Sequence, residues 1–122
     1  MSLILHSITP SVYSLIERRI AVVDSHPVIQ MAIERALRTA GATTVAVSDN
    51  RLEGAVLGIG LEYESNLAPL ALELFRRGIP FLFYTGQGEV DISPIRRAWP
   101  GCKILPKPTS ANEVAQAAVW LF

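Results

Sequence analysis

The chain has 122 residues, half of them apolar, and its eleven basic residues balance its eleven acidic ones. That length suits one domain with a real core, since domains most often have about 100 to 150 residues. The balanced charge argues against a nucleic-acid-binding surface, and the single Cys102 excludes an intramolecular disulfide and a cysteine-based zinc site. No apolar run approaches the ~20 residues of a membrane helix, so we expect a cytoplasmic protein without membrane contact.

Residues 1–18 precede the regular part of the sequence and are predicted to be an N-terminal extension or linker, with the domain proper at 19–122. Within the extension, Thr9-Pro10 is a suitable cap for a short helix carrying Val12, Leu15 and Ile16. Such a helix would pack onto the domain or onto a neighbour. A linker without a packing role is the alternative.

From Arg19 onward, short β-branched apolar runs alternate with helical patterns, which predicts a parallel sheet covered by helices on both faces. Strands buried on both faces are continuous apolar runs, as in Ile20-Ala21-Val22-Val23. The predicted strands are Ile20–Asp24, Thr43–Ser48, Ala55–Gly60, Phe81–Thr85 and Lys103–Pro106. Five such strands fit a doubly wound α/β sheet.

The predicted helices have recognisable start and stop signals. Pro27 suits a first helical position, and Gly41 and Gly78 suit the residues that end helices. Ser110 and Glu113 have the spacing of a capping box, in which each side chain accepts a hydrogen bond from the other residue's backbone N–H. The helices are predicted from Pro27 to the stop at Gly41, over Leu67–Arg77, over Ser93–Trp99, and from Ser110 to the C-terminus.

One connection is unusually short. Only Asp49–Gly54 separate the second and third predicted strands, whereas a parallel crossover normally takes a dozen residues or more. The helix between these strands is therefore predicted to be missing or reduced to about one turn. A crossover of that length that passes the first strand has to be nearly extended, because six residues reach only about 20 Å.

In an open α/β sheet the ligand site lies beyond the carboxyl ends of the strands. The residues at those ends are Asp24-Ser25, Gly58, Thr85 and Lys107. In order and spacing this set resembles the response-regulator receiver family. The resemblance spans 19–122 and rests on Val22-Val23-Asp24-Ser25-His26-Pro27, Tyr84-Thr85-Gly86 and Leu105-Pro106-Lys107-Pro108. It implies a flavodoxin-like receiver fold and a place in two-component phosphorelay signalling.

The chain departs from the family pattern at the residues that carry phosphate chemistry. Gly58 stands where the resemblance places the phosphoacceptor Asp, and glycine has no nucleophile. Ser25 replaces a second acidic residue that binds Mg²⁺ in the family, and a hydroxyl is a poor substitute for a carboxylate. Ile104 lies three residues before Lys107, where many members of the family have an aromatic residue that rotates on activation. The sequence therefore predicts a degenerate receiver, with no catalytic residue, no metal site and no cofactor.

Two interpretations of Asp24, Thr85 and Lys107 stay open. In the first they form a structural hydrogen-bonded cluster, with the Lys107 ammonium directed toward Asp24 or the Thr85 hydroxyl. In the second the altered pocket binds a nucleotide or another small anion, which would make the chain a flavodoxin-like binding domain.

The last helix carries the predicted partner surface. At 100° per residue, Val114, Ala117, Ala118 and Leu121 face the sheet, while Gln116, Val119 and Trp120 face outward. No charged residue follows Glu113 in the chain, and aromatic residues are enriched in interface cores. We expect this face to bind a signalling protein, such as a histidine kinase or output domain, or to mediate self-association. The alternative is that Trp120 folds back over the domain edge or against residues 1–18.

Overall fold

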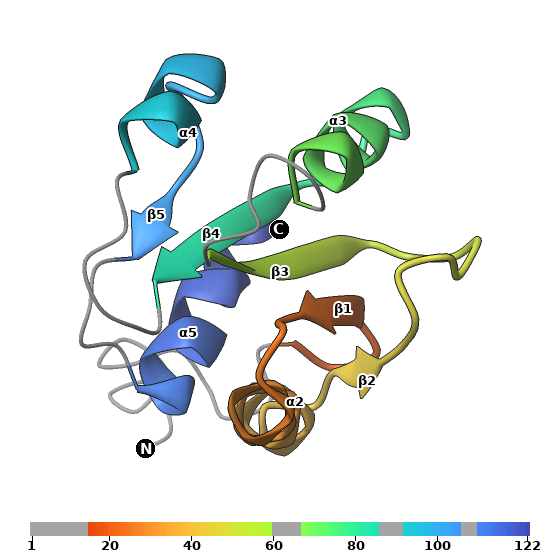
Figure 1. The fold of residues 1–122 in the computed structure, drawn as a ribbon. Helices are drawn as coiled ribbons and strands as arrows, with labels where there is room; N and C mark the ends of the chain where they lie inside the picture. The colour runs from red at the N-terminus through yellow and green to blue at the C-terminus, as the bar shows by residue number, and fades with distance from the viewer. Residues whose placement is uncertain (1–14, 60–66, 86–91, 106–109) are drawn as a thin grey trace, which may run out of the picture.

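A computed structural model describes residues 15–59, 67–85, 92–105 and 110–122. Over these residues the chain forms a parallel five-stranded sheet with strand order β2-β1-β3-β4-β5 (Figure 1). The strands are β1 (Arg19–Val23), β2 (Thr43–Thr44), β3 (Gly54–Ile59), β4 (Phe81–Thr85) and β5 (Ile104–Leu105). The predicted doubly wound parallel sheet is confirmed. The two edge strands, β2 and β5, are shorter than predicted.

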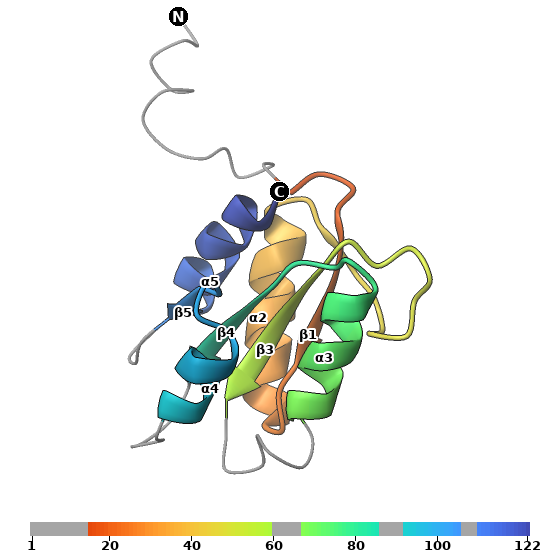
Figure 2. The same ribbon diagram turned by 90° about the horizontal axis from the view of Figure 1, so that it is seen from above.

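Helices cover both faces of the sheet (Figure 2). One face carries α2 (Pro27–Thr39) and α5 (Ala111–Ala118), which continues into the 3₁₀ turn η2 (Val119–Leu121); the other carries α3 (Ala68–Arg76) and α4 (Ser93–Ala98). The Ser110–Glu113 capping box that starts α5 forms as predicted. No helix in the described ranges is long and apolar enough to cross a membrane.

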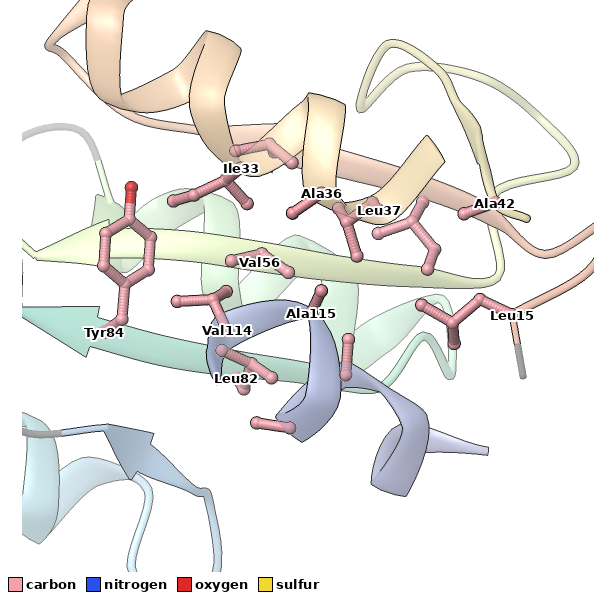
Figure 3. Packing of buried hydrophobic residues seen from close by; sticks show 14 residues of the cluster. Leu15, Ile33, Ala36, Leu37, Ala42, Val56, Leu82, Tyr84, Val114 and Ala115 are labelled. Atoms are coloured by element: carbon pink, nitrogen blue, oxygen red, sulfur yellow. The ribbon is translucent and has the colours of Figure 1, made fainter. Parts of the chain in front are cut away.

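Successive side chains of the central strands point to opposite faces and build two separate cores. Val56 and Leu82 pack with α2 and α5, whereas Leu57 and Phe83 pack with α3 and α4. Figure 3 shows the first of these cores, with Tyr84 of β4 at one end and Leu15 at the other. Tyr84 thus belongs to the core and also reaches the carboxyl end of the sheet, where the central strands β1, β3 and β4 end.

The crossover from β2 to β3 contains no helix, as the short connection predicted; residues 45–53 are turns and irregular chain. Charged groups hold it in place. Arg19 Nη2 lies 2.5 Å from Asp49 Oδ2, and Arg18 Nη1 lies 3.1 Å from Glu53 Oε2. Arg77, at the end of α3, donates to the carbonyl oxygens of Val47 and Asp49. The hydrogen bond from Arg19 lowers the pKa of Asp49, so this carboxylate stays ionised and keeps its arginine partner.

The residues just before β1 are part of the folded unit. Leu15 is buried in the core, and its N–H donates to the Ala40 carbonyl at 3.1 Å. Gly41 has φ +102°, and a Cβ there would lie 2.8 Å from Ile16 Cγ1, so both its backbone and its neighbours require glycine. The short helix predicted after Thr9-Pro10 falls almost entirely outside the described residues, and residues 15–17 form a turn.

Candidate functional site

Asp24 lies directly after β1, where the chain turns into α2. Its Oδ1 accepts a hydrogen bond from the His26 backbone N–H at 2.7 Å, which is the short Asx turn typical of such a position. Its own N–H donates to Gln30 Oε1 of α2 at 3.2 Å. The side chain is only 7% exposed, so this carboxylate is held in a fixed orientation below the protein surface.

Tyr84 supplies the second partner of that carboxylate. Its hydroxyl donates to Asp24 Oδ2, and the residue is only 2% exposed. Burial, followed by the hydrogen bond to Asp24, raises the pKa of the phenol far above its usual value. The phenol therefore stays protonated and remains a hydrogen-bond donor throughout the physiological pH range.

Gly58 completes the arrangement on β3. It is the register partner of Tyr84, so both residues occupy the same level of the sheet. A Cβ on Gly58 would lie 2.5 Å from Asp24 Oδ2 and 2.8 Å from the Tyr84 hydroxyl oxygen. Those separations are far below van der Waals contact. The space next to Gly58 is already filled by the phenol and the carboxylate.

The structure describes the other predicted site residues only in part. Ser25 is exposed, and its Oγ lies 3.3 Å from His26 Nδ1. Thr85 ends β4 opposite Ile59. Lys107 lies outside the described residues, so its predicted contact with Asp24 or Thr85 stays a prediction.

The residues present do not fit the Mg²⁺ ion that the receiver resemblance implies. Both oxygens of Asp24 already accept hydrogen bonds, and Gly58 adds no ligand. Over the described part of the chain, no group of three His, Cys, Asp or Glu side chains is placed to hold a metal. Magnesium is usually bound through one or two carboxylates that are free to enter octahedral geometry, and the described residues at this end of the sheet offer none.

Two of the three side chains predicted to face outward on the last helix are exposed. Gln116 is exposed and Trp120 is 78% exposed, so Trp120 does not fold back over the domain edge. Val119, expected on the same outer face, is instead half-buried against the α2–α5 core. The prediction failed there because the buried face of the last helix is wider than expected: Ala115, one helical turn before Val119, is also buried in that core.

An apolar hollow of about 920 Å³ lies beside Trp120, where α3 and α4 end. Phe75 is 65% exposed at its rim, and its ring lies 5.6 Å from that of Trp99. The floor includes Phe81 at the start of β4. The hollow is therefore at the amino ends of the strands, away from Asp24 and Gly58.

Tyr84 was missed by the sequence interpretation, which treated Tyr84-Thr85-Gly86 as the end of a strand and singled out only the threonine. A signal was present in the sequence, since a bulky Tyr and a Gly stand near the ends of two predicted strands. Only the register of β3 and β4 shows that the two residues face each other.

Comparison with known proteins identifies the fold. No protein-family model matches the chain, and no curated protein sequence does. Solved structures match with TM-scores near 0.6. The BeF3-activated conformation of SdrG from Pseudomonas melonis Fr1 is 29% identical, with TM-score 0.62 over 85% of this chain and 96% of that one.

Two more distant structures agree with this result. A response regulator from Thermotoga maritima is 12% identical, with TM-score 0.62 over 87% of this chain and 98% of that one. An orphan response regulator of H. pylori is 11% identical, with TM-score 0.63 over 85% and 95% of the two chains. The chain thus has the fold of a response-regulator receiver domain.

Proposed function

We propose that this chain acts in two-component signalling as a receiver that works without phosphorylation, through protein contacts. The observation that carries the proposal is the closed group of Asp24, Gly58 and Tyr84 at the carboxyl edge of the sheet. Aspartyl phosphorylation requires a carboxylate nucleophile beside a bound cation. Here glycine occupies the acceptor position, and the neighbouring carboxylate already accepts hydrogen bonds from a phenol and a backbone N–H.

The competing proposal, a nucleotide or small anion bound at the same edge, has less support. The polar groups described around Gly58 are the Asp24 carboxylate and a phenol that donates to it. A carboxylate repels phosphate, and the one nearby phenolic donor is already used. A phosphate-binding loop needs several free backbone N–H groups or cationic side chains instead.

For the contact itself we propose self-association through Gln116 and Trp120 at the end of the chain. An exposed Trp beside an apolar hollow is self-complementary about a two-fold axis, because each copy can insert its Trp120 into the hollow of the other. Large aromatic side chains that enter pockets are the usual energetic centres of interfaces. The Val119 side chain, half-buried, contributes less than the sequence pattern predicted.

The proposal is tested by incubating the chain with acetyl phosphate and Mg²⁺ and measuring its intact mass. The expected result is no phosphoryl adduct under conditions in which a receiver with an intact acceptor Asp is modified. A mass gain of one phosphoryl group that maps to this chain would refute the proposal. The reference receiver, treated in the same tube, controls for the activity of the reagent.

A further inference from the structure

The pairing of Gly58 with Tyr84 has a consequence for any attempt to restore a phosphate site. The two residues are register partners on adjacent parallel strands, and Val56 and Leu82, two residues earlier, share one core. Side chains at 58 and 84 therefore compete for the same volume. The Tyr84 ring occupies that volume now, with its hydroxyl on Asp24 Oδ2.

We infer that Tyr84 is an internal plug of a divalent-cation site in which one carboxylate, Asp24, is still in place. The inference rests on the proposed function and adds a physical cause for the absence of cation binding and phosphorylation. Gly58 and Tyr84 form an interlocked pair, so that a carboxylate at position 58 and the phenol at position 84 exclude each other. Neither Gly58→Asp nor Tyr84→Val alone restores cation binding.

The acceptor position cannot take a carboxylate while the phenol is in place. An aspartate at 58 brings its Cβ to 2.5 Å from Asp24 Oδ2 and 2.9 Å from Tyr84 Cζ, so the phenol ring has to move. The ring has little freedom to do so, because Tyr84 is 2% exposed and packs within the α2–α5 core. The new carboxylate would also face the buried Asp24 without a cation between them, and two like charges at that distance disfavour each other.

Removing the plug alone is no better. A valine at position 84 frees the ring volume and one oxygen of Asp24, but Gly58 still supplies no ligand. The site then has one buried carboxylate beside the exposed Ser25. A Mg²⁺ ion sheds its water reluctantly, so each further carboxylate strengthens its binding. Tight cation binding therefore requires both changes together, also when Ser25→Asp adds a carboxylate beside Asp24.

The experiment is a double-substitution cycle in a Ser25→Asp parent, which adds an exposed carboxylate in every member of the set. The members are the parent, parent with Gly58→Asp, parent with Tyr84→Val, and parent with both. Mg²⁺ affinity is measured by isothermal titration calorimetry, the melting temperature is measured without metal, and circular dichroism monitors folding. Mg²⁺ chloride is the probe, with Ca²⁺ as a second cation.

We expect Mg²⁺ to bind the variant with both Gly58→Asp and Tyr84→Val at least about tenfold more tightly than any other member of the set. The interaction energy between two contacting residues is commonly large enough to change an affinity by that factor. We also expect Gly58→Asp to lower the melting temperature less when position 84 is valine than when it is tyrosine. The matched control is Tyr84→Phe with Gly58→Asp, which keeps the ring and removes only the hydroxyl. It should bind Mg²⁺ no better than Gly58→Asp alone.

Two results would overturn the inference. One is equal Mg²⁺ affinity in the variants with and without Tyr84 when Gly58→Asp is present. The other is a folded, doubly changed variant that binds Mg²⁺ no more tightly than the parent. If valine at 84 prevents folding, Tyr84→Leu fills more of the ring volume and is measured instead. A phosphoryl adduct on the unmodified chain would contradict the proposed function, which is a separate outcome from either of these.

Discussion

Aromatic side chains are buried at one end of the central strands and exposed at the other. At the carboxyl end, Tyr84 is 2% exposed and directs its hydroxyl to a buried carboxylate. At the amino end, Phe75 and Trp120 are 65% and 78% exposed around an apolar hollow. In a receiver fold the first end is the place for phosphate chemistry. The contrast is between a carboxyl end where the space beside Gly58 is filled and an amino end with exposed apolar surface, which is the basis of the proposed function.

The largest expected effect is the loss of the buried aromatic ring. Tyr84→Ala should reduce the free energy of unfolding by about 3–5 kcal/mol, because it empties a fully packed volume and leaves Asp24 Oδ2 without its hydrogen-bond donor. Phe75→Ala, the matched control at the open end, should cost about 1 kcal/mol or less, since that ring already contacts solvent. Urea denaturation of both variants measures the difference. Equal losses would mean that the two ends are packed alike and would remove the basis of the contrast.

A smaller effect is expected for a single added methyl group. Gly58→Ala should destabilise the fold by about 1–3 kcal/mol, because its Cβ would overlap Asp24 and Tyr84. Gly101→Ala is the control, since a Cβ there meets nothing within 4 Å and its φ is not positive. That variant should stay within about 0.5 kcal/mol of the unmodified chain. A neutral Gly58→Ala in the same denaturation assay would show that the site has spare room.

The sequence predicted the strands and the short crossover, but it did not predict how the space beside Gly58 is filled. Continuous apolar runs predicted the parallel strands, and the short spacing before Gly54 predicted a crossover without a helix. The resemblance also placed Gly58 at the acceptor position, which stays a prediction. The filling of the space beside Gly58 by Tyr84 could not be predicted, because it depends on strand register, which no local pattern specifies.

The open end was predicted only in part for a similar reason. The position of Trp120 followed from helical periodicity, and its exposure confirms that prediction. The half-buried Val119 did not follow, because alanine suits buried and exposed positions alike, so the burial of Ala115 one turn earlier cannot be predicted from the sequence. The strand predicted at Thr43–Ser48 extends only over Thr43–Thr44, although the Val45 N–H still donates to the Ile20 carbonyl; Val45 and Val47 are half-buried against the core on the α3 side.

The smallest effect on stability is expected at the open end, together with the largest effect on association. Trp120→Glu should change the free energy of unfolding by less than about 0.5 kcal/mol, because the side chain is mostly in solvent. It should abolish self-association in sedimentation velocity experiments, since a charge cannot enter the apolar hollow of a second copy without a large desolvation cost.

Val28→Glu is the matched control for that experiment. Val28 is 80% exposed on α2, and it is not among the residues that line the hollow. The same change of an exposed apolar residue to glutamate should leave association unaltered there. If the unmodified chain is monomeric at high concentration, or if both variants behave alike, self-association through Trp120 is wrong.

The central claim is that the edge formed by Asp24, Gly58 and Tyr84 is closed to a cation and a phosphoryl group. A nuclear magnetic resonance titration of the uniformly ¹⁵N-labelled chain with Mg²⁺ and then beryllofluoride, a phosphoryl mimic, tests it most directly. The closed arrangement predicts no saturable shift of the backbone amide signals of Asp24, His26, Gly58 and Tyr84. Saturable shifts clustered on these residues would show an open, ligand-binding site and contradict the account.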